Sequence, residues 1–265
     1  MLEINNVSLS IGHRWLVDGI SFNVLPGEVV TICGPNGAGK SSLMRLISGE
    51  LPPSSGNVSW HGKPIAQWNM LTLARHRTLL QQRCDVSFDY TALEVILLGR
   101  HPHHLGATRP LDVRIAEAAL AEVDASHLAG NIYTTLSGGE QARVQMARVL
   151  AQIWESSETP RLLLLDEPTA ALDPRQQHRI LSIARAWAEK GDVAVVAIVH
   201  DLNLASLYAD RIALLKDGKL QIIDNVQAVV TPEAIETCFD LPCVLLEHPD
   251  GGTPVMVARR GLGNQ

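Results

Sequence analysis

Apolar and polar residues alternate along the start of the chain, a pattern typical of strands that bury one face. The alternating apolar residues are Val7, Leu9, Ile11, Trp15, Val17, Phe22 and Val24. The turn signal Pro26-Gly27 precedes the largely apolar run 29–33, as expected of a strand covered on both faces. From Ser41 onward, apolar residues recur three and four positions apart, which predicts a helix. The pattern therefore predicts a strand, a glycine-rich loop and a helix in succession.

The middle of the chain, roughly 84–154, has mainly helical spacing. It predicts one helix over Val113–Leu128, ended by Gly130, and another from Gly138 through Val149 to Ile153. The polar segment Glu155–Pro160 predicts an exposed loop that ends this helical region.

Strand and helix patterns alternate again in the last third, which is typical of a parallel sheet. The predicted elements are a strand at Leu162–Leu165, a helix at Arg175–Lys190 ended by Gly191, a strand at Val193–Val199, a hairpin about Asp217-Gly218 and a last helix beginning at Thr231-Pro232-Glu233. The residues after Leu241 predict no element. The fold class is therefore expected to be α/β.

Composition limits the function classes. The 265 residues, 46% hydrophobic and 19% charged, are those of an ordinary globular protein with one large domain or a core and a subdomain. The longest apolar run is far shorter than the ~18–20 residues that cross a bilayer, and residues 1–10 do not resemble a signal peptide. A net charge of −6 argues against a sequence-independent grip on nucleic acid. The cysteines, too few and too scattered for a disulfide scaffold, are Cys33, Cys84, Cys238 and Cys243. We expect a soluble, reduced, cytoplasmic protein.

Residues 34–41 match the pattern G-x-x-x-x-G-K-S between the predicted strand and helix. Backbone N–H groups of such a loop and the helix N-terminus bind phosphate oxygens. Lys40 would neutralise the β- and γ-phosphates, and the Ser41 hydroxyl would bind Mg²⁺. The predicted nucleotide contacts are Gly34, Pro35, Asn36, Gly37, Ala38, Gly39, Lys40, Ser41 and Ser42. The alternative is a glycine-rich turn that only resembles a phosphate-binding loop.

Two carboxylates follow the apolar run Leu162–Leu165. Asp166 stands where a phosphate-loop site would hold Mg²⁺, directly or through water. Glu167 stands where a base could polarise the water that attacks the γ-phosphate. The alternative is a surface Asp-Glu pair at the end of a core strand.

The run Leu136-Ser137-Gly138-Gly139-Glu140-Gln141 makes the interpretation specific. Together with the phosphate loop and the 166–167 pair, it resembles the ATPase subunits of ATP-binding-cassette (ABC) transporters, over about residues 1–240. The resemblance implies a P-loop NTPase with a RecA-like core, an N-terminal antiparallel β-subdomain and an inserted α-helical subdomain. The implied division is core and β-subdomain at about 1–83 and 160–240, helical signature subdomain at 84–159 and C-terminal tail at 241–265.

In that family two subunits pair head to tail, so that each signature closes on the partner's nucleotide. The resemblance therefore implies a homodimer that binds two ATP with Mg²⁺, in which closure is transmitted to the membrane subunits. The signature contacts it implies are Ser137, Gly138, Gly139 and Glu140, and amides at a helix start are independently suited to bind an anion.

Further positions match the family one at a time. Gln82 resembles the glutamine that contacts Mg²⁺ and the attacking water, with Gln81 as the neighbouring candidate. Asp173 resembles the aspartate of the loop at the dimer seam, and His200 resembles the histidine that touches the γ-phosphate. Taken alone, a histidine at a strand end is more often structural than catalytic. The family also places an adenine-stacking aromatic residue where this chain has Ile11, so His13 or Trp15 is an alternative.

Several runs resemble the importers of iron chelates and cobalamin, and within that group those of haem. They are 99–103, 133–135, 150–154 and 200–205. The resemblance implies haem as cargo, with a ferric siderophore or cobalamin as alternatives. It implies two transmembrane permease subunits as partners, a periplasmic substrate-binding protein indirectly, no nucleic acid, and a peripheral location on the cytoplasmic face of the bacterial inner membrane.

Two other classes of protein carry a phosphate loop. Soluble cassette ATPases of DNA repair or translation usually have a long coiled-coil insertion or two cassettes, whereas only 55 positions separate Gln82 from Ser137. A P-loop kinase or GTPase would leave the signature unexplained, and the chain has no Asn-Lys-x-Asp guanine motif. Both are weaker than the transporter ATPase.

Overall fold

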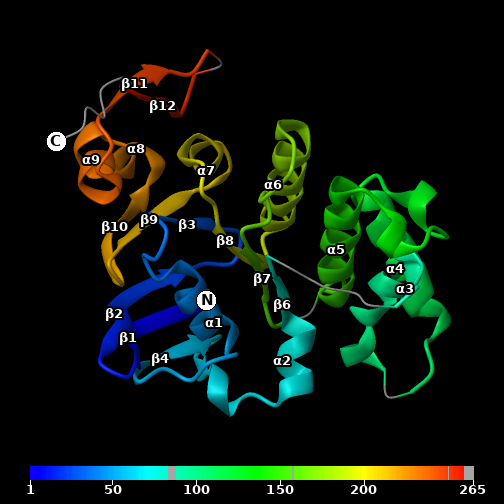
Figure 1. Ribbon diagram of the computed structural model, residues 1–265. Helices are drawn as coiled ribbons and strands as arrows, with labels where there is room; N and C mark the ends of the chain where they lie inside the picture. The colour runs from blue at the N-terminus through cyan, green and yellow to red at the C-terminus, as the bar shows by residue number, and fades with distance from the viewer. Residues whose placement is uncertain (83–87, 105, 157, 250, 260–265) are drawn as a thin grey trace.

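The computed structural model describes residues 1–82, 88–104, 106–156, 158–249 and 251–259 (Figure 1). Within these residues a six-stranded sheet has the order β10-β9-β3-β8-β7-β6. Its strands are β3 (Val29–Cys33), β6 (Arg77–Leu80), β7 (Arg161–Asp166), β8 (Val193–Ile198), β9 (Arg211–Lys216) and β10 (Lys219–Asn225). Only β10 pairs antiparallel in this sheet. The inner strands β3 and β8 are buried along their whole length, as both faces are covered.

A second, antiparallel sheet has the order β2-β1-β4-β5. Its strands are β1 (Leu2–Ile11), β2 (Arg14–Val24), β4 (Ser55–Trp60) and β5 (Lys63–Pro64), followed by the 3₁₀ turn η1 (Ile65–Gln67). Helix α1 (Lys40–Ser48) packs with this sheet and one face of the larger sheet in one hydrophobic core. Apolar and polar residues therefore alternate along β1 and β2 because one face of this sheet is buried and the other is exposed.

A group of helices stands beside the β6 edge of the larger sheet, and Figure 1 shows it as a separate lobe that we call the helical arm. The arm consists of α3 (Ala92–Leu98), η2 (His101–His103), α4 (Pro110–Glu122), η3 (Ser126–Leu128), η4 (Tyr133–Thr135) and α5 (Gly138–Gln152). Helix α2 (Met70–His76) leads into β6 and contacts η2. The arm shares a second hydrophobic core with the outer face of the larger sheet.

The C-terminal part covers that outer face with helices and ends in a hairpin. Its elements are α6 (Pro174–Ala188), α7 (Leu202–Tyr208), α8 (Val226–Val229), α9 (Pro232–Phe239), β11 (Cys243–Glu247) and β12 (Pro254–Ala258). The Asn203 side chain holds the hairpin on α7, since its Nδ2 donates to the Met256 carbonyl (3.2 Å) and its Oδ1 accepts from the Met256 N–H (2.8 Å). This hairpin was not predicted.

The predicted order of strands, loops and helices is confirmed, with one helix misplaced. The helix expected at Val113–Leu128 is α4, which begins at Pro110 and ends at Glu122. It ends early because Asp124 adopts a left-handed backbone (φ 49°), after which Ser126–Leu128 forms a separate 3₁₀ turn. Cys84 and the proposed boundary at 83/84 lie outside the described residues.

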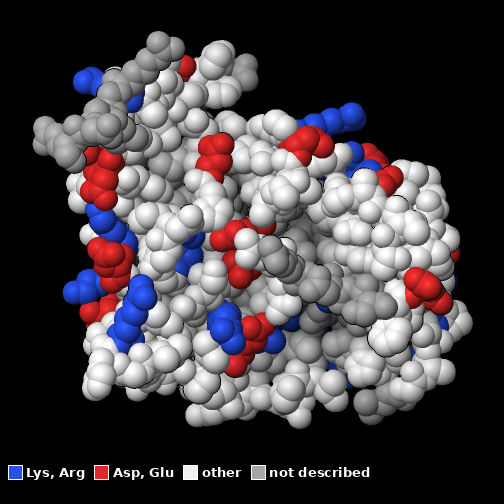
Figure 2. Space-filling model, viewed as in Figure 1, with Lys and Arg blue, Asp and Glu red and all other residues white. Residues whose placement is uncertain are grey.

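Charge is distributed without a dominant sign on the face seen in Figure 2, where basic and acidic side chains intersperse. Among the helices that the structure describes, we find none with both the length and the apolar character needed to span a membrane.

Candidate nucleotide-binding site

At two positions in the loop between β3 and α1 there is room only for glycine. A β-carbon at Gly34 (φ 155°) would lie 2.1 Å from the Leu215 carbonyl oxygen, and one at Gly39 (φ 98°) would lie 2.2 Å from the Leu16 carbonyl oxygen. The loop therefore runs in van der Waals contact with β9 and with the start of β2, and its backbone is free to turn toward a ligand.

Lys40 lies inside this loop. Its Nζ donates to the carbonyl oxygens of Gly34 (2.7 Å) and Pro35 (3.0 Å), and burial lowers the pKa of the ammonium group. A pocket of about 250 Å³ opens beside it. Its lining residues are Arg14, Leu16, Asn36, Gly37, Ala38, Gly39, Lys40, Ser41, Ser42 and Glu167. Seven predicted phosphate contacts thus line one pocket, together with the predicted base.

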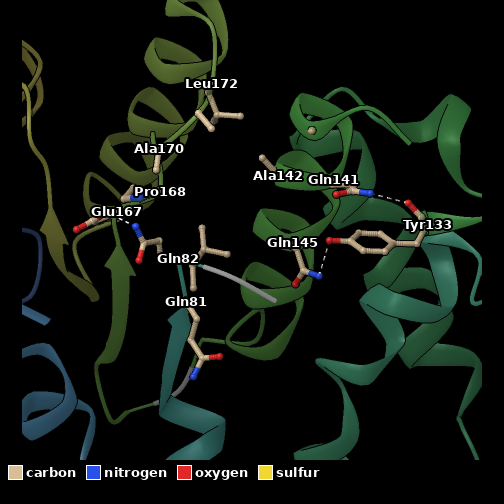
Figure 3. Close-up of a pocket in the computed structure, with 13 residues that line it drawn as sticks. Gln81, Gln82, Tyr133, Gln141, Ala142, Gln145, Glu167, Pro168, Ala170 and Leu172 are labelled. Atoms are coloured by element: carbon tan, nitrogen blue, oxygen red, sulfur yellow. Dashed lines mark hydrogen bonds between the residues drawn. The ribbon is translucent and has the colours of Figure 1, made fainter. Parts of the chain in front are cut away.

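Gln82, Glu167 and His200 meet at the carboxyl ends of three adjacent strands, β6, β7 and β8. Gln82 Nε2 donates to Glu167 Oε2 (2.5 Å; Figure 3), and His200 Nε2 lies 2.7 Å from Glu167 Oε1. Glu167 has a left-handed backbone (φ 53°), which is uncommon for a residue other than glycine. The structure thus brings the three predicted catalytic residues together although 118 positions separate the first from the last.

Asp166 is the last residue of β7, and its carboxylate is suited to a cation. Its Oδ1 is buried without a hydrogen-bond partner among the described residues. Burial and the neighbouring charges of Glu167 and Glu50 raise the pKa of this carboxyl group to about 6. An unpaired buried carboxylate oxygen is a ligand that Mg²⁺ prefers, so the residues present fit this metal.

The signature begins α5, and its serine and glutamate bind each other. The Ser137 N–H (2.8 Å) and Oγ–H (2.7 Å) both donate to Glu140 Oε2. These hydrogen bonds lower the pKa of the Glu140 carboxyl group. Gly138 lines a pocket of about 450 Å³ between the arm and the segment Glu167–Leu172 (Figure 3).

No signature residue is among the described residues that line the phosphate-loop pocket. The chain therefore does not close its signature over its own phosphate loop. Asp173, the predicted seam residue, caps α6 by accepting a hydrogen bond from the Gln176 N–H (3.0 Å).

Arg14 is a site residue that sequence reasoning missed. In the β1–β2 hairpin Ile11 pairs with Arg14, and Ser10 pairs with Trp15, so Ile11 and Arg14 share one face and Trp15 lies on the other. Arg14 lines the phosphate-loop pocket, and among the described residues no hydrogen bond or ion pair engages its guanidinium. Neither His13 nor Trp15, the two predicted alternatives for adenine stacking, lines this pocket. In the sequence Arg14 looks like any exposed arginine, and only the pairing register of β1 and β2 could have placed it on the same face as Ile11.

Comparison with known proteins decides the family. Residues 17–170 match the family model described as ABC transporter. The chain is 71% identical to the hemin import ATP-binding protein HmuV of Methylobacillus flagellatus, over 98% of this chain and 97% of that protein. It is 47% identical to the HmuV protein of Gloeobacter violaceus, over 97% of this chain and 94% of the relative. The chain belongs to the ABC transporter family.

Solved ABC structures share the fold. An ABC transporter of metal-chelate type, in an inward-facing conformation, superimposes with a TM-score of 0.82 at 25% identity, over 97% of this chain and 96% of that one. A dimeric bacterial ABC transporter cassette gives a TM-score of 0.74 at 28% identity, over 85% and 98% of the two chains. The family and fold predicted from the phosphate loop and signature are confirmed, and this ABC ATPase binds ATP and couples its hydrolysis to transport.

Proposed function

We propose that this ABC ATPase powers the import of haem through a membrane permease. The observation that carries the proposal is the 71% identity, over nearly the whole chain, to a hemin import ATP-binding protein. A ferric siderophore or another metal chelate is the second candidate cargo, favoured by the metal-chelate transporter among the structural neighbours at 25% identity. The far higher identity favours haem.

In the proposed mechanism the phosphate loop, residues 34–42, binds the phosphates of ATP through its amides and Lys40. Mg²⁺ bound by Ser41, Asp166 and Gln82 would neutralise phosphate charge. Glu167 accepts a proton from water as the water oxygen bonds to the γ-phosphorus and the bond to the β–γ bridging oxygen breaks, which yields ADP and phosphate.

Two neighbours orient Glu167 for this step. Gln82 Nε2 and His200 Nε2 each hold one of its carboxylate oxygens, at 2.5 Å and 2.7 Å, and each oxygen retains a further lone pair for the proton of a water molecule. His200 would also contact the γ-phosphate. The geometry supports these roles because Glu167, which the other two side chains contact, lines the phosphate-loop pocket.

Two copies of the chain would pair head to tail. Ser137, Gly138, Gly139, Glu140 and Asp173 of one copy would face the nucleotide of the other. The separation of the signature from the phosphate loop within one chain supports this arrangement. The dimer would bind two permease subunits at the cytoplasmic face of the inner membrane, and a periplasmic binding protein would deliver the cargo to the permease. Within each chain we propose that the core, helical subdomain and tail are divided at 83/84, 159/160 and 240/241.

Deletion of the gene in its host tests the cargo. We expect growth on haem as the sole iron source to fail, growth on a ferric siderophore to persist, and the wild-type gene but not its Lys40→Ala variant to restore haem use. Growth on haem without the gene would refute the proposal. Loss of siderophore use with haem use intact would instead favour the second candidate.

A further inference from the structure

The C-terminal hairpin is bonded to the helix that follows the nucleotide site. Strand β12 lies against α7, and the Asn203 side chain bonds to one residue of that strand (Figure 1). Asn203 Nδ2 donates to the Met256 carbonyl oxygen (3.2 Å), and Asn203 Oδ1 accepts from the Met256 N–H (2.8 Å). Since the N–H and carbonyl of one residue in an antiparallel strand point to the same side, both groups of Met256 lie on the edge of β12 away from β11. Asn203 thus pairs with this edge as a neighbouring strand would.

The hairpin itself is anchored on the core. Cys243 is buried, and the partly buried Leu245 and Met256 pack against the same hydrophobic core as α7 and α9. The N–H of Arg259 donates to the Pro242 carbonyl oxygen (2.9 Å), which closes the base of the hairpin. The hairpin is therefore a fixed support for whatever is bonded to its edge.

Helix α7 is short and depends on hydrogen bonds at its start. Its seven residues span about 10 Å, which is shorter than the ~12–15 residues that an isolated helix needs. Asp201 Oδ1 accepts from the N–H groups of Asn203 (2.8 Å) and Leu204 (3.2 Å). Leu204 and Ala205 are buried, but apolar contacts are not directional. The hydrogen bonds of Asp201 and Asn203 therefore set the orientation of the first turn.

His200 lies between this turn and the larger sheet. The residue before it is held to β3, because the Val199 N–H donates to the Ile32 carbonyl oxygen (3.2 Å). The His200 side chain is 45% exposed, and its Nε2 lies 2.7 Å from Glu167 Oε1. Since little packing surrounds the imidazole, its direction follows from the backbone on either side. That backbone is fixed by β3 on one side and by the first turn of α7 on the other.

We propose that Asn203 is a positioning residue, which clamps α7 to the C-terminal hairpin and so keeps His200 directed at Glu167 and the γ-phosphate. The inference rests on the proposed contact between His200 and the γ-phosphate. Asn203 is not among the described residues that line the phosphate-loop pocket. Loss of its hydrogen bonds should therefore weaken recognition of the γ-phosphate and leave the binding of ADP, which lacks that phosphate, unchanged.

Binding of ADP and of the non-hydrolysable analogue β,γ-imido-ATP to the purified full-length chain tests the proposal, together with steady-state ATP hydrolysis. Asn203→Leu keeps the size of the side chain without its hydrogen bonds. We expect the affinity ratio of β,γ-imido-ATP to ADP, and kcat, each to fall about three- to tenfold, the effect of about one buried hydrogen bond. The affinity for ADP should stay within about twofold. Asn57→Leu, the same change at an exposed position of β4, should match the wild type.

The hairpin supplies an independent variant, which decides the question if Asn203→Leu does not fold. Met256→Pro removes the N–H that donates to Asn203, on a free strand edge where proline is tolerated, and should lower the ratio and kcat in the same way. Ala258→Pro makes the same change two residues further along this edge, at an exposed position, and should match the wild type.

A double variant tests whether Asn203 acts through His200. If it does, Asn203→Leu should change neither the affinity ratio nor kcat any further in a His200→Ala background. Fully additive losses, wild-type values for both Asn203→Leu and Met256→Pro, or equal weakening of ADP and β,γ-imido-ATP binding would each overturn the proposal. A wild-type affinity ratio in His200→Ala alone would instead count against the proposed contact of His200 with the γ-phosphate, on which the inference rests.

Discussion

At the scale of single residues, the geometry of Glu167 fits its proposed role as the base. Its left-handed backbone (φ 53°) costs conformational energy, of the order of 1–3 kcal/mol for such sites, and two side chains from neighbouring strands hold the carboxylate. Strain of this kind persists where the surroundings fix a group in one orientation, as a base in phosphoryl transfer requires. Asp166, the residue before it, keeps an unpaired buried oxygen for a cation.

Arg14 gives a prediction at this scale. Arg14 lines the phosphate-loop pocket on the hairpin face that it shares with Ile11, and a guanidinium can stack on a base. Arg14→Ala should weaken ATP binding about five- to tenfold, the effect of one lost cation–π contact. Binding of inorganic tripolyphosphate should stay unchanged, because it has no base, and fluorescence titration can measure both ligands.

The hairpin supplies the controls for this prediction. Trp15→Ala, on the opposite face, should bind ATP as the wild type does, and Ile11→Tyr should restore the affinity lost in Arg14→Ala by providing an aromatic surface. If tripolyphosphate binding weakens as much as ATP binding, Arg14 contacts phosphate and not the base.

At the scale of elements, sequence alone predicts what local chemistry encodes. The strand, glycine loop and helix over residues 29–48, Thr231 as the cap of α9 and the Asp217-Gly218 hairpin all follow from short-range rules and are confirmed. The end of α4 depends on the left-handed backbone of Asp124, and the hairpin β11–β12 depends on Asn203, 53 positions before its partner Met256. Such features escaped prediction because the contacts that decide them are tertiary.

Helix α4 and the buried Arg100 give a prediction on stability. Asp112 is fully buried and ion-paired with Arg100 (3.1 Å), and hydrogen bonds from Arg109, above all, hold the pKa of its carboxyl group below the usual value. Asp112→Asn removes one of the two carboxylates that pair with the buried Arg100, the other being Glu155 (2.5 Å), and should lower the free energy of unfolding at pH 7 by about 2 kcal/mol, as measured by urea titration.

This difference should depend on pH in one direction. Since the folded pKa lies below the unfolded value, ionised Asp112 stabilises the native state above the unfolded pKa, and the effect is lost as pH falls through the folded pKa. The difference between the two proteins should therefore begin to narrow below about pH 4, the unfolded pKa of an aspartate, and should close only as pH approaches the lower folded pKa. Glu117→Gln, an exposed change on the same helix, should alter stability little at any pH. A gap between Asp112→Asn and wild type that stays constant from pH 7 to pH 3 would contradict the ion-pair argument.

At the scale of the whole molecule, the proposed dimer makes each chain contribute half of each of two nucleotide sites. The sequence predicts the residues of both halves, because each lies in a short motif, and Gln82, Glu167 and His200 meet because parallel strands present their carboxyl ends at one sheet edge. How the arm joins the core at β6 could not be predicted, since the hydrogen bonds of Gln152, the last residue of α5, reach positions 74–78 and 103, which no motif connects.

The most direct measurement is ATP turnover by Glu167→Gln, with the oligomeric state followed by light scattering. Glutamine cannot accept the proton of the attacking water, so kcat should fall at least about 100-fold. The phosphate loop is unchanged, so ATP should still bind and a dimer should accumulate in ATP but not in ADP. Turnover by Glu167→Gln at the wild-type rate, or a chain that stays monomeric with ATP bound, would contradict the account.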